Sequence, residues 1–181
     1  KKNIPCLGVE PTNLAASIAQ EKNINTLIKF FSYKTANEIL QKYKKSSLII
    51  ANNVLPHVPD INDFLKGIAF ILDDDGIVSI EFQHLLSLIK HGYWDTIYHE
   101  HYSYLSLDFM LKAAKKFNLE VFDVEIIPTH GGSLRVFLKH ILSKREINFK
   151  KINTLLENEN KYGCKLPKTF LKLQDRALKA K

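Results

Sequence analysis

Short apolar segments alternate with segments of helical period along most of the chain, and this alternation constrains the fold more than any other feature. Residues 47–53 have a continuously apolar centre, Leu48–Ala51, which is typical of a parallel strand covered on both faces. Residues 60–72 repeat apolar side chains at helical spacing, as at Leu65 and Ile68. Strands that alternate with helices of about 10–15 residues predict βαβ units and a parallel sheet.

The same patterns place the remaining elements. We predict strands at 7–10, 25–31, 47–53, 76–82, 120–127 and 133–141, and helices that begin at Thr12 or Asn13 and that cover 35–43, 60–72 and 107–117. Two further helices follow residue 141, Asp73–Gly76 predicts a turn, and residues 83–106 have no clear period. Gly131 and Gly132 can adopt the positive φ of a tight hairpin between the last two strands. We therefore expect an α/β fold with a doubly wound, mostly parallel sheet and a C-terminal antiparallel hairpin, followed by helices.

The composition is that of a chain with one globular core. Of the 181 residues 45% are hydrophobic and 25% are charged, which excludes a disordered or collagen-like chain. No window approaches the run of about 18 apolar residues that a membrane span needs, and the first residues lack the apolar region of a signal peptide. The two cysteines, Cys6 and Cys164, exclude a disulfide framework and a four-cysteine zinc site. We therefore expect a cytoplasmic protein with no membrane partner.

The positive charge is concentrated in the last part of the chain. The formal net charge is +7, but residues 1–140 contain 15 basic and 15 acidic side chains, whereas residues 141–181 contain 11 basic and 4 acidic ones. A nucleic-acid-binding surface more often spreads basic and aromatic residues over one face of the fold. The charge distribution therefore argues against a nucleic-acid partner.

Polar residues follow two of the predicted strands, at the edge where α/β sheets bind their ligands. Glu10 ends the first strand, and the two oxygens of a carboxylate match the two hydroxyls of a ribose, although a solvated acid is the alternative. Asn52, Asn53 and His57 follow the most apolar strand. The alternative for the asparagines is a loop whose side chains bond its own backbone, and for His57 it is a structural hydrogen bond.

Residues 96–104 are the densest polar and aromatic stretch, and they fit neither a strand nor a helix. A strand would place Tyr98 and Glu100 on one face with His101 pointing away, and a helix would bring Tyr98 and His101 together without Glu100. An irregular loop could bring all three together. Histidine is the usual general base near neutral pH, and a carboxylate or a phenol can orient it. A hydrogen-bonded aromatic loop is the alternative, and a metal site at His99 and His101 is less favoured because metallopeptidase helices space their histidines by four residues.

The link of the predicted hairpin and the residues after it form the last candidate segment. Two neighbouring glycines let backbone N–H groups approach a ligand closely. We assign substrate binding to His130, Gly131, Ser133 and Arg135, with turn glycines beside a surface histidine as the alternative.

Four segments in this order resemble one family. Leu7–Ala15 resembles the second strand of class I S-adenosylmethionine-dependent methyltransferases, which have a Rossmann-like fold, and Asn52–Asp60 resembles the loop after their fourth strand. Asp95–Tyr104 and Thr129–Val136 are more specific. Together they resemble the NDP-sugar C-methyltransferases, which methylate C3 of 4-keto deoxysugars.

The resemblance implies that only the middle of a family member is present. Members carry an N-terminal cysteine-rich zinc domain and a C-terminal Rossmann-like domain, so zinc is expected only in such a missing N-terminal domain. No glycine-rich turn precedes Glu10, so the first strand and its loop are expected to be missing as well. Residues 1–141 would be a partial methyltransferase domain, and 142–181 a basic helical linker towards a missing C-terminal domain.

The resemblance also implies a mechanism that needs no metal ion. His101 corresponds to the base that removes a proton from the carbon beside the ketone, and the resulting carbanion takes the methyl group of S-adenosylmethionine. Tyr98 and Glu100 match residues that orient the base and hold the sugar. Tyr98 or His57 would donate a hydrogen bond to the keto oxygen as negative charge develops there.

Cofactor binding is assigned to Glu10, Asn52 and Asn53, with Glu10 on the ribose of S-adenosylmethionine. The expected partner is a nucleotide-sugar substrate. The alternatives are a non-catalytic Rossmann-like interaction module and a methyltransferase that acts on another small molecule or on RNA.

Overall fold

Strands and helices alternate along residues 4–180, the part of the chain that this computed structural model describes; of His130 and Ala180 it describes only the backbone. The strands are β1 (Gly8–Val9), β2 (Thr26–Leu27), β3 (Ser46–Asn52), β4 (Leu72–Gln83), β5 (Leu119–Ile127) and β6 (Ser133–His140). The α-helices are α1 (Asn13–Glu21), α2 (Tyr33–Leu40), α3 (Ile61–Ile71), α4 (Leu85–His91), α5 (Leu107–Lys115), α6 (Phe149–Lys161) and α7 (Pro167–Ala180). Short 3-10 helices lie at Leu55–His57, Trp94–Thr96 and Thr129–Gly131.

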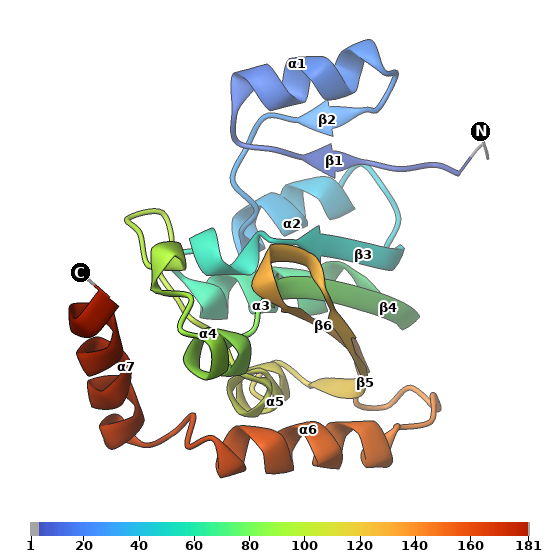
Figure 1. Ribbon diagram of the computed structural model, residues 1–181. Helices are drawn as coiled ribbons and strands as arrows, with labels where there is room; N and C mark the ends of the chain where they lie inside the picture. The colour runs from blue at the N-terminus through green and yellow to red at the C-terminus, as the bar shows by residue number, and fades with distance from the viewer. Residues whose placement is uncertain (1–3, 181) are drawn as a thin grey trace.

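Four of the strands form one sheet in the order β3-β4-β6-β5, and β1 pairs with β2 in a separate sheet. The pairings β1–β2 and β3–β4 are parallel, whereas β6 runs antiparallel to both of its neighbours. Figure 1 shows β1, β2 and α1 at the top and α6 at the bottom, on the β5 side of the sheet. The predicted α/β fold and its antiparallel hairpin are confirmed. The four-stranded sheet is mixed because β6 lies between β4 and β5.

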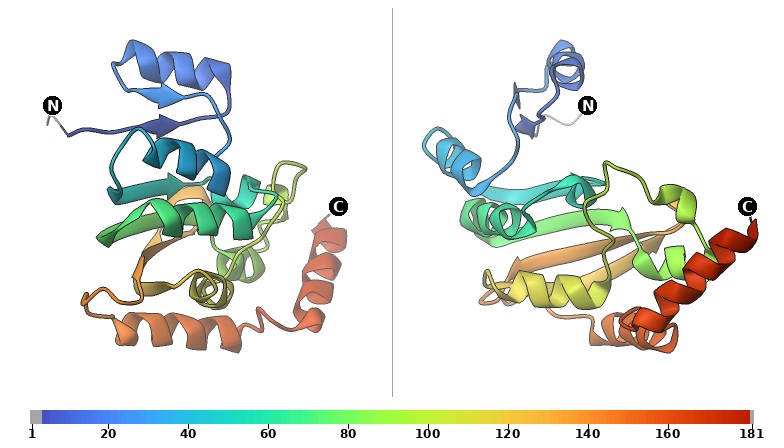
Figure 2. Two further views of the ribbon diagram at one scale, coloured as in Figure 1. Left: turned by 180° about the vertical axis from the view of Figure 1, so that it is seen from behind. Right: turned by 90° about the vertical axis from the view of Figure 1, so that its left-hand side faces the viewer.

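One face of the four-stranded sheet carries the core. Val78, Ile80 and Phe82 alternate along β4 and are completely buried. Their register partners on β6 are completely buried as well, namely Leu138, Val136 and Leu134. The apolar faces of α3 and α5 belong to the same cluster, and both helices run along the sheet (Figure 2). This packing fixes the ends of β3 and β4, which lead into the candidate site.

The strand predicted at 25–31 is much shorter than expected. Only β2 forms, because its one partner among the described strands is the equally short β1. The chain turns away directly afterwards, where the Lys29 N–H donates to the Leu27 carbonyl at 3.1 Å. The apolar side chains of Ile28 and Phe30 are exposed. The apolar residues that follow β2 therefore have the sequence pattern of a strand without forming one.

Two other predictions between residues 73 and 106 need correction. The turn predicted at Asp73–Gly76 is wrong, because β4 begins at Leu72 and contains these residues in an irregular stretch opposite Ser46 and Leu48 of β3. A bulge of this kind absorbs extra residues without ending a strand. Helix α4 lies in the stretch for which we predicted no helix; seven residues are too few to establish a helical period.

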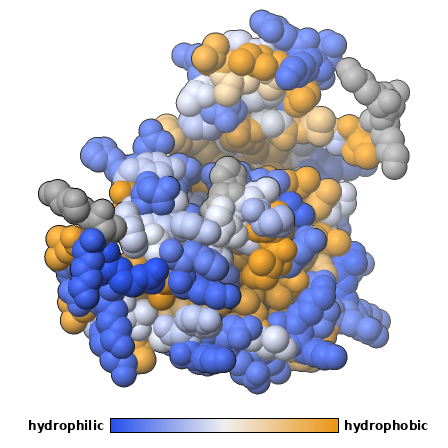
Figure 3. Space-filling view, in the orientation of Figure 1, coloured by the Kyte–Doolittle hydropathy of each residue, from blue (hydrophilic) through white to orange (hydrophobic). Residues whose placement is uncertain are grey.

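The two sheets share no strand pairing among the described residues, and an apolar groove of about 180 Å³ lies between them. Leu7 and Val9 line the groove on the β1 side, and Leu48 and Ile50 line it on the β3 side. Figure 3 shows hydrophobic residues where the part formed by α1, β1 and β2, at the top of the view, meets the rest of the protein. That a first strand and a glycine-rich loop of the family would precede β1 stays a prediction.

The basic C-terminal segment packs against the rest of the protein. Ile152 and Leu155 of α6 and Leu173 of α7 are buried in the main core cluster. Helix α7 lies against α4, where the Arg176 guanidinium donates to the Ile89 carbonyl at 3.1 Å. The domain boundary at residue 141 stays a prediction, although α6 shares its core with the sheet. None of the helices α1 to α7 is both long and apolar enough to cross a membrane.

The thiol of Cys164 provides a test of this packing. Burial raises its pKa to about 11, and the negative charge of Glu159 adds to the shift. Because the thiolate is the reactive form, we expect iodoacetamide to label Cys164 about 100-fold more slowly than an unshifted thiol, with the rate increasing as the pH rises towards 11. Peptide mass spectrometry of the folded protein measures this, with the exposed Cys6 as the control. Equal labelling of both cysteines would contradict the buried position of Cys164.

Candidate functional site

A cavity of about 480 Å³ opens at the carboxyl ends of β3 and β4, where α/β sheets bind their ligands. Its walls come from the segment after β3, the end of β4, the segment between α4 and α5, and the link between β5 and β6. Five of the predicted site residues line it, namely Asn53, His57, Tyr98, His101 and Gly131. The structure therefore brings together residues that the sequence places in three separate segments.

His101 is held at both ring nitrogens. Its Nδ1 lies 3.0 Å from the Thr96 carbonyl oxygen, and its Nε2 lies 3.0 Å from the Tyr98 hydroxyl. A carbonyl only accepts hydrogen bonds, so Nδ1 carries the proton and the neutral ring has its lone pair on Nε2. The Tyr98 hydroxyl therefore donates to Nε2, and the two rings lie 4.2 Å apart. His101 therefore has the tautomer in which Nε2 can act as a base, and this nitrogen faces the Tyr98 hydroxyl.

His57 lies beside His101, with ring centroids 4.8 Å apart. Its Nδ1 lies 2.9 Å from the Glu100 carbonyl oxygen, so the same reasoning places the proton of the neutral ring on Nδ1. Its Nε2 is then an acceptor. A neutral His57 therefore cannot donate to a keto oxygen through Nε2, and Tyr98 is the better donor of the two candidates.

Glu100 contacts His57 through its main-chain carbonyl. Its carbonyl oxygen orients His57, whereas its carboxylate makes no hydrogen bond among the residues that the structure describes and is exposed. The role of that carboxylate in holding a sugar stays a prediction. Tyr104 adds an edge-on contact to His101 at 6.0 Å, and burial raises the pKa of its hydroxyl, which keeps it protonated.

Five further residues line the cavity that were not among the predicted site residues, namely Pro56, Gln83, Tyr93, Asp95 and Thr96. Gln83 ends β4, so the strand-end rule that selected Glu10 could have found it. Tyr93 lies so close to Gly131 that a Cβ at Gly131 would approach the tyrosine ring to 2.8 Å. Gly131 has a φ of 74°. Both observations explain why glycine occupies this wall.

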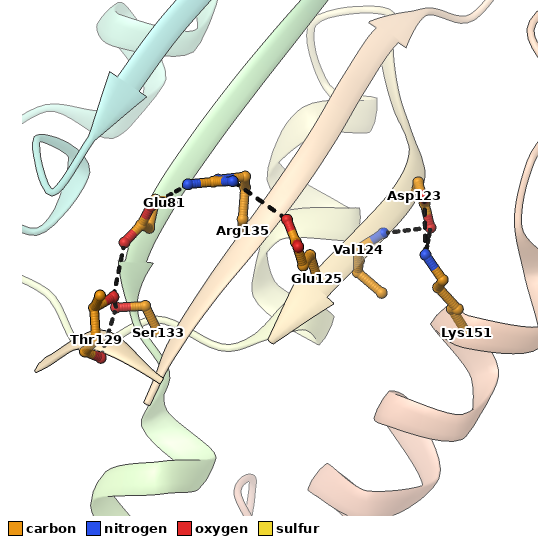
Figure 4. Close-up of polar contacts among 8 residues, drawn as sticks. All are labelled: Glu81, Asp123, Val124, Glu125, Thr129, Ser133, Arg135 and Lys151. Atoms are coloured by element: carbon orange, nitrogen blue, oxygen red, sulfur yellow. Dashed lines mark hydrogen bonds and ion pairs between the residues drawn. The ribbon is translucent and has the colours of Figure 1, made fainter. Parts of the chain in front are cut away.

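Arg135 and Ser133 belong to a polar row on the sheet and do not line the cavity (Figure 4). The Arg135 guanidinium lies 2.8 Å from Glu81 and 3.2 Å from Glu125, its register partners on the two neighbouring strands. Thr129 donates to Glu81 at 3.2 Å and lies 3.4 Å from the Ser133 hydroxyl. Their assignment to substrate binding stays a prediction. The same holds for His130, whose side chain lies outside the described part of the chain.

The predicted cofactor residues lie at the ends of β1 and β3. Glu10 accepts hydrogen bonds at Oε1 from the N–H and the hydroxyl of Thr12, at 2.8 and 2.6 Å. Its Oε2 has no hydrogen bond within the described residues. Asn52 ends β3, and Asn53 has a left-handed φ of 54° with its N–H on the Glu81 carbonyl at 2.7 Å. Asn53 thereby turns the chain towards the cavity.

A comparison with known families matches residues 1–124 to the methyltransferase domain family. This chain belongs to that family. The membership accounts for the α/β fold and for a cavity at the carboxyl ends of the strands. S-adenosylmethionine is the cofactor of the family, as the sequence predicted.

Individual relatives agree with this membership. The chain is 31% identical over 141 residues to the C-methyltransferase NovU of Streptomyces niveus, a match that covers 78% of this chain and 34% of NovU. The chain thus spans about a third of the length of this relative. Among solved structures, a possible histamine N-methyltransferase of Thermotoga maritima shares the fold with a TM-score of 0.58, 16% identity and coverage of 74% and 72% of the two chains. A magnesium protoporphyrin IX methyltransferase of Synechocystis with bound SAH has a TM-score of 0.53 at 13% identity and covers 73% and 62%.

The contact of Glu10 to the cofactor's ribose stays a prediction, and the geometry of Glu10 is compatible with it. A carboxylate fixed at one oxygen by Thr12 keeps its second oxygen available for a ribose hydroxyl. The position of Glu10 at the end of a parallel strand is the usual place for that contact. When S-adenosylmethionine is bound, its sulfonium supplies the methyl group that is transferred.

Proposed function

We propose that this methyltransferase domain methylates the carbon beside the ketone of a nucleotide-activated 4-keto deoxysugar. The observation that carries the proposal is the hydrogen-bonded chain Thr96–His101–Tyr98 in the wall of the cavity. Transfer to the saturated carbon beside a ketone needs a base that first removes its proton, whereas transfer to a neutral amine does not. The similarity to the C-methyltransferase NovU supports the same class of reaction.

In this proposal His101 takes the proton at Nε2. The Thr96 carbonyl accepts from Nδ1–H and favours the imidazolium that forms, because a positive ring is a stronger donor. The electron pair of the broken C–H bond moves into the enolate. For this step Tyr98 first turns its hydroxyl from Nε2 to the keto oxygen, which frees the lone pair of Nε2 for the substrate proton and places a donor where the enolate charge develops.

The other residues of the cavity position the reactants. Gln83 at the end of β4 and Gly131 in the link between β5 and β6 can hold the sugar against His101, while Asn53 after β3 keeps its predicted contact to the cofactor. A site of this kind contributes mainly proximity and the exclusion of water. No residue of the chain needs to form a covalent bond to the substrate.

We further propose that the partner is a nucleotide-sugar and that nucleic acid is not bound. Several basic residues of the C-terminal segment are already engaged, since Lys165 lies 2.7 Å from Asp108 and Lys151 lies 3.2 Å from Asp123. Each of these ion pairs lowers the net positive charge that the segment presents to the phosphates of a nucleic acid.

The proposal is tested by incubating the full-length protein with S-adenosylmethionine and a nucleotide-linked 4-keto deoxysugar. We expect a product that is heavier by one methyl group, with the new carbon attached beside the ketone by NMR. A second observable is exchange of the neighbouring proton with deuterated water, which needs only the base. Methylation on oxygen or nitrogen, or turnover that is equally fast with the 4-hydroxy sugar, would contradict the enolate mechanism.

Replacement of Glu10 tests the cofactor assignment. Glu10→Ala removes the acceptor of the ribose hydroxyl, and a lost hydrogen bond to a charged group costs about 1.5–3 kcal/mol. We therefore expect the affinity for S-adenosylmethionine to fall by about 10- to 100-fold in calorimetry. Glu21→Ala, at the exposed end of α1, is the control and retains the affinity. Unchanged binding by Glu10→Ala would remove Glu10 from the cofactor site.

A further inference from the structure

Glu159 is a buried acid that lies outside the cavity and comes from α6, beyond the part of the chain that matches the family. Its side chain and that of His84 are each 1% exposed. One carboxylate oxygen lies 2.7 Å from His84 Nε2 and accepts the Leu107 N–H at 2.6 Å, and the other accepts the Asp108 N–H at 3.1 Å. Burial of a carboxylate is costly unless such bonds replace its lost hydrogen bonds to water. The three partners of Glu159 therefore fix where its carboxylate lies.

Those three partners mark the two ends of the segment that contains the proposed base. His84 precedes α4, and Leu107 and Asp108 begin α5. Residues 84–107 form a closed loop between these points, because His84 pairs with Leu105 in a parallel bridge and the Leu85 N–H donates to the Leu105 carbonyl at 2.9 Å. One carboxylate therefore holds both ends of this closed loop.

His84 also connects this loop to the opposite wall of the cavity. The His84 N–H donates to the Gly132 carbonyl at 3.1 Å, and the neighbouring Gly131 lines the cavity. A shift of His84 would thus move the base loop and the hairpin link together.

We propose that Glu159 is a positioning residue for the base His101. It touches no atom of the cavity, and it acts by fixing His84 and the start of α5 so that the loop between them keeps Tyr98, His101 and Thr96 in hydrogen-bonding distance. This inference rests on the proposed function for its kinetic consequence, but its structural consequence at His101 is independent of the substrate. It also makes α6 a functional part of the methyltransferase domain.

The test compares Glu159→Ala, Glu159→Gln and the control Glu157→Gln, an exposed position on the same helix. Nitrogen NMR of the full-length protein reports the tautomer and hydrogen bonds of the His101 ring, and circular dichroism reports whether each variant is folded. In Glu159→Ala we expect altered His101 signals and a fall in kcat of about 10- to 100-fold, because a small misplacement of a reacting group has effects of this size. The KM for S-adenosylmethionine should not change.

The Gln variant distinguishes positioning from a general loss of stability. Its carbonyl oxygen can still accept from His84 and Leu107, while its amide faces the Asp108 N–H without bonding it, so we expect a smaller but measurable change of the His101 signals and partial rescue of kcat. Wild-type His101 signals in folded Glu159→Ala, or in Glu159→Gln if the Ala variant does not fold, would overturn the proposal. If the wild-type protein does not methylate the sugar, the proposed function fails while the NMR comparison still decides the role of Glu159.

Discussion

Replacing His101 with alanine lowers the rate of methyl transfer by about 100- to 10,000-fold, the range that a general base contributes. The substitution removes the nitrogen that would take the proton and leaves the Tyr98 hydroxyl without its partner. The affinity for S-adenosylmethionine should remain, because the substitution leaves the predicted cofactor residues Glu10, Asn52 and Asn53 in place. Single-turnover kinetics and calorimetry on the full-length protein measure the two quantities separately.

His99→Ala is the matched control for this prediction. His99 lies in the same loop, is exposed and does not line the cavity. Its loss should leave turnover nearly unchanged. Retained proton exchange in deuterated water by His101→Ala would show that another group is the base, and His57, whose ring lies 4.8 Å away, would be the next residue to replace.

The part of the site that is local in sequence could be predicted, because its chemistry needs few neighbours. Tyr98 and His101 stand three residues apart, and an irregular loop brings the phenol onto the ring as expected. The contribution of Glu100 could not be predicted, since it comes from a carbonyl that every residue has. Side-chain patterns carry no information about which main-chain groups become partners.

Contacts between elements that are distant in the sequence could not be predicted for a different reason. Glu159 and His84 are 75 residues apart, and each one alone fits an ordinary polar position on a helix or at a helix end. Only the folded arrangement of α4, α5 and α6 shows that they meet where both side chains are buried. The two ion pairs of Arg135 could not be predicted for the same reason, because Glu81 and Glu125 stand on neighbouring strands that only the fold brings beside it.

The sequence predicted the long helices with a buried apolar stripe most closely. Helix α3 differs from its prediction by one residue at each end, and its apolar stripe is buried against the sheet. By contrast, β2 and α4 are too short for periodicity to define them, and their lengths depend on what they pair with. A pattern of apolar residues therefore predicts an element well when the element is long enough to show a repeated buried face.

Replacing Phe82 with alanine should lower the free energy of unfolding by about 3–5 kcal/mol, the usual effect of truncating a buried aromatic side chain. Phe82 is completely buried at the end of β4, opposite Leu134 on β6, and directly precedes the cavity residue Gln83. The cost combines the lost transfer of the ring from water with the cavity that it leaves. Urea denaturation followed by circular dichroism measures it.

Phe30→Ala is the matched control for the same side chain in a different environment. Phe30 is 76% exposed, so its loss should change the free energy of unfolding by less than about 0.5 kcal/mol. A cost below about 1 kcal/mol for Phe82→Ala would mean that the sheet and helices collapse around the gap. In that case the end of β4 could not hold the cavity wall rigidly, and the positioning of reactants proposed for Gln83 and its neighbours would lose its structural basis.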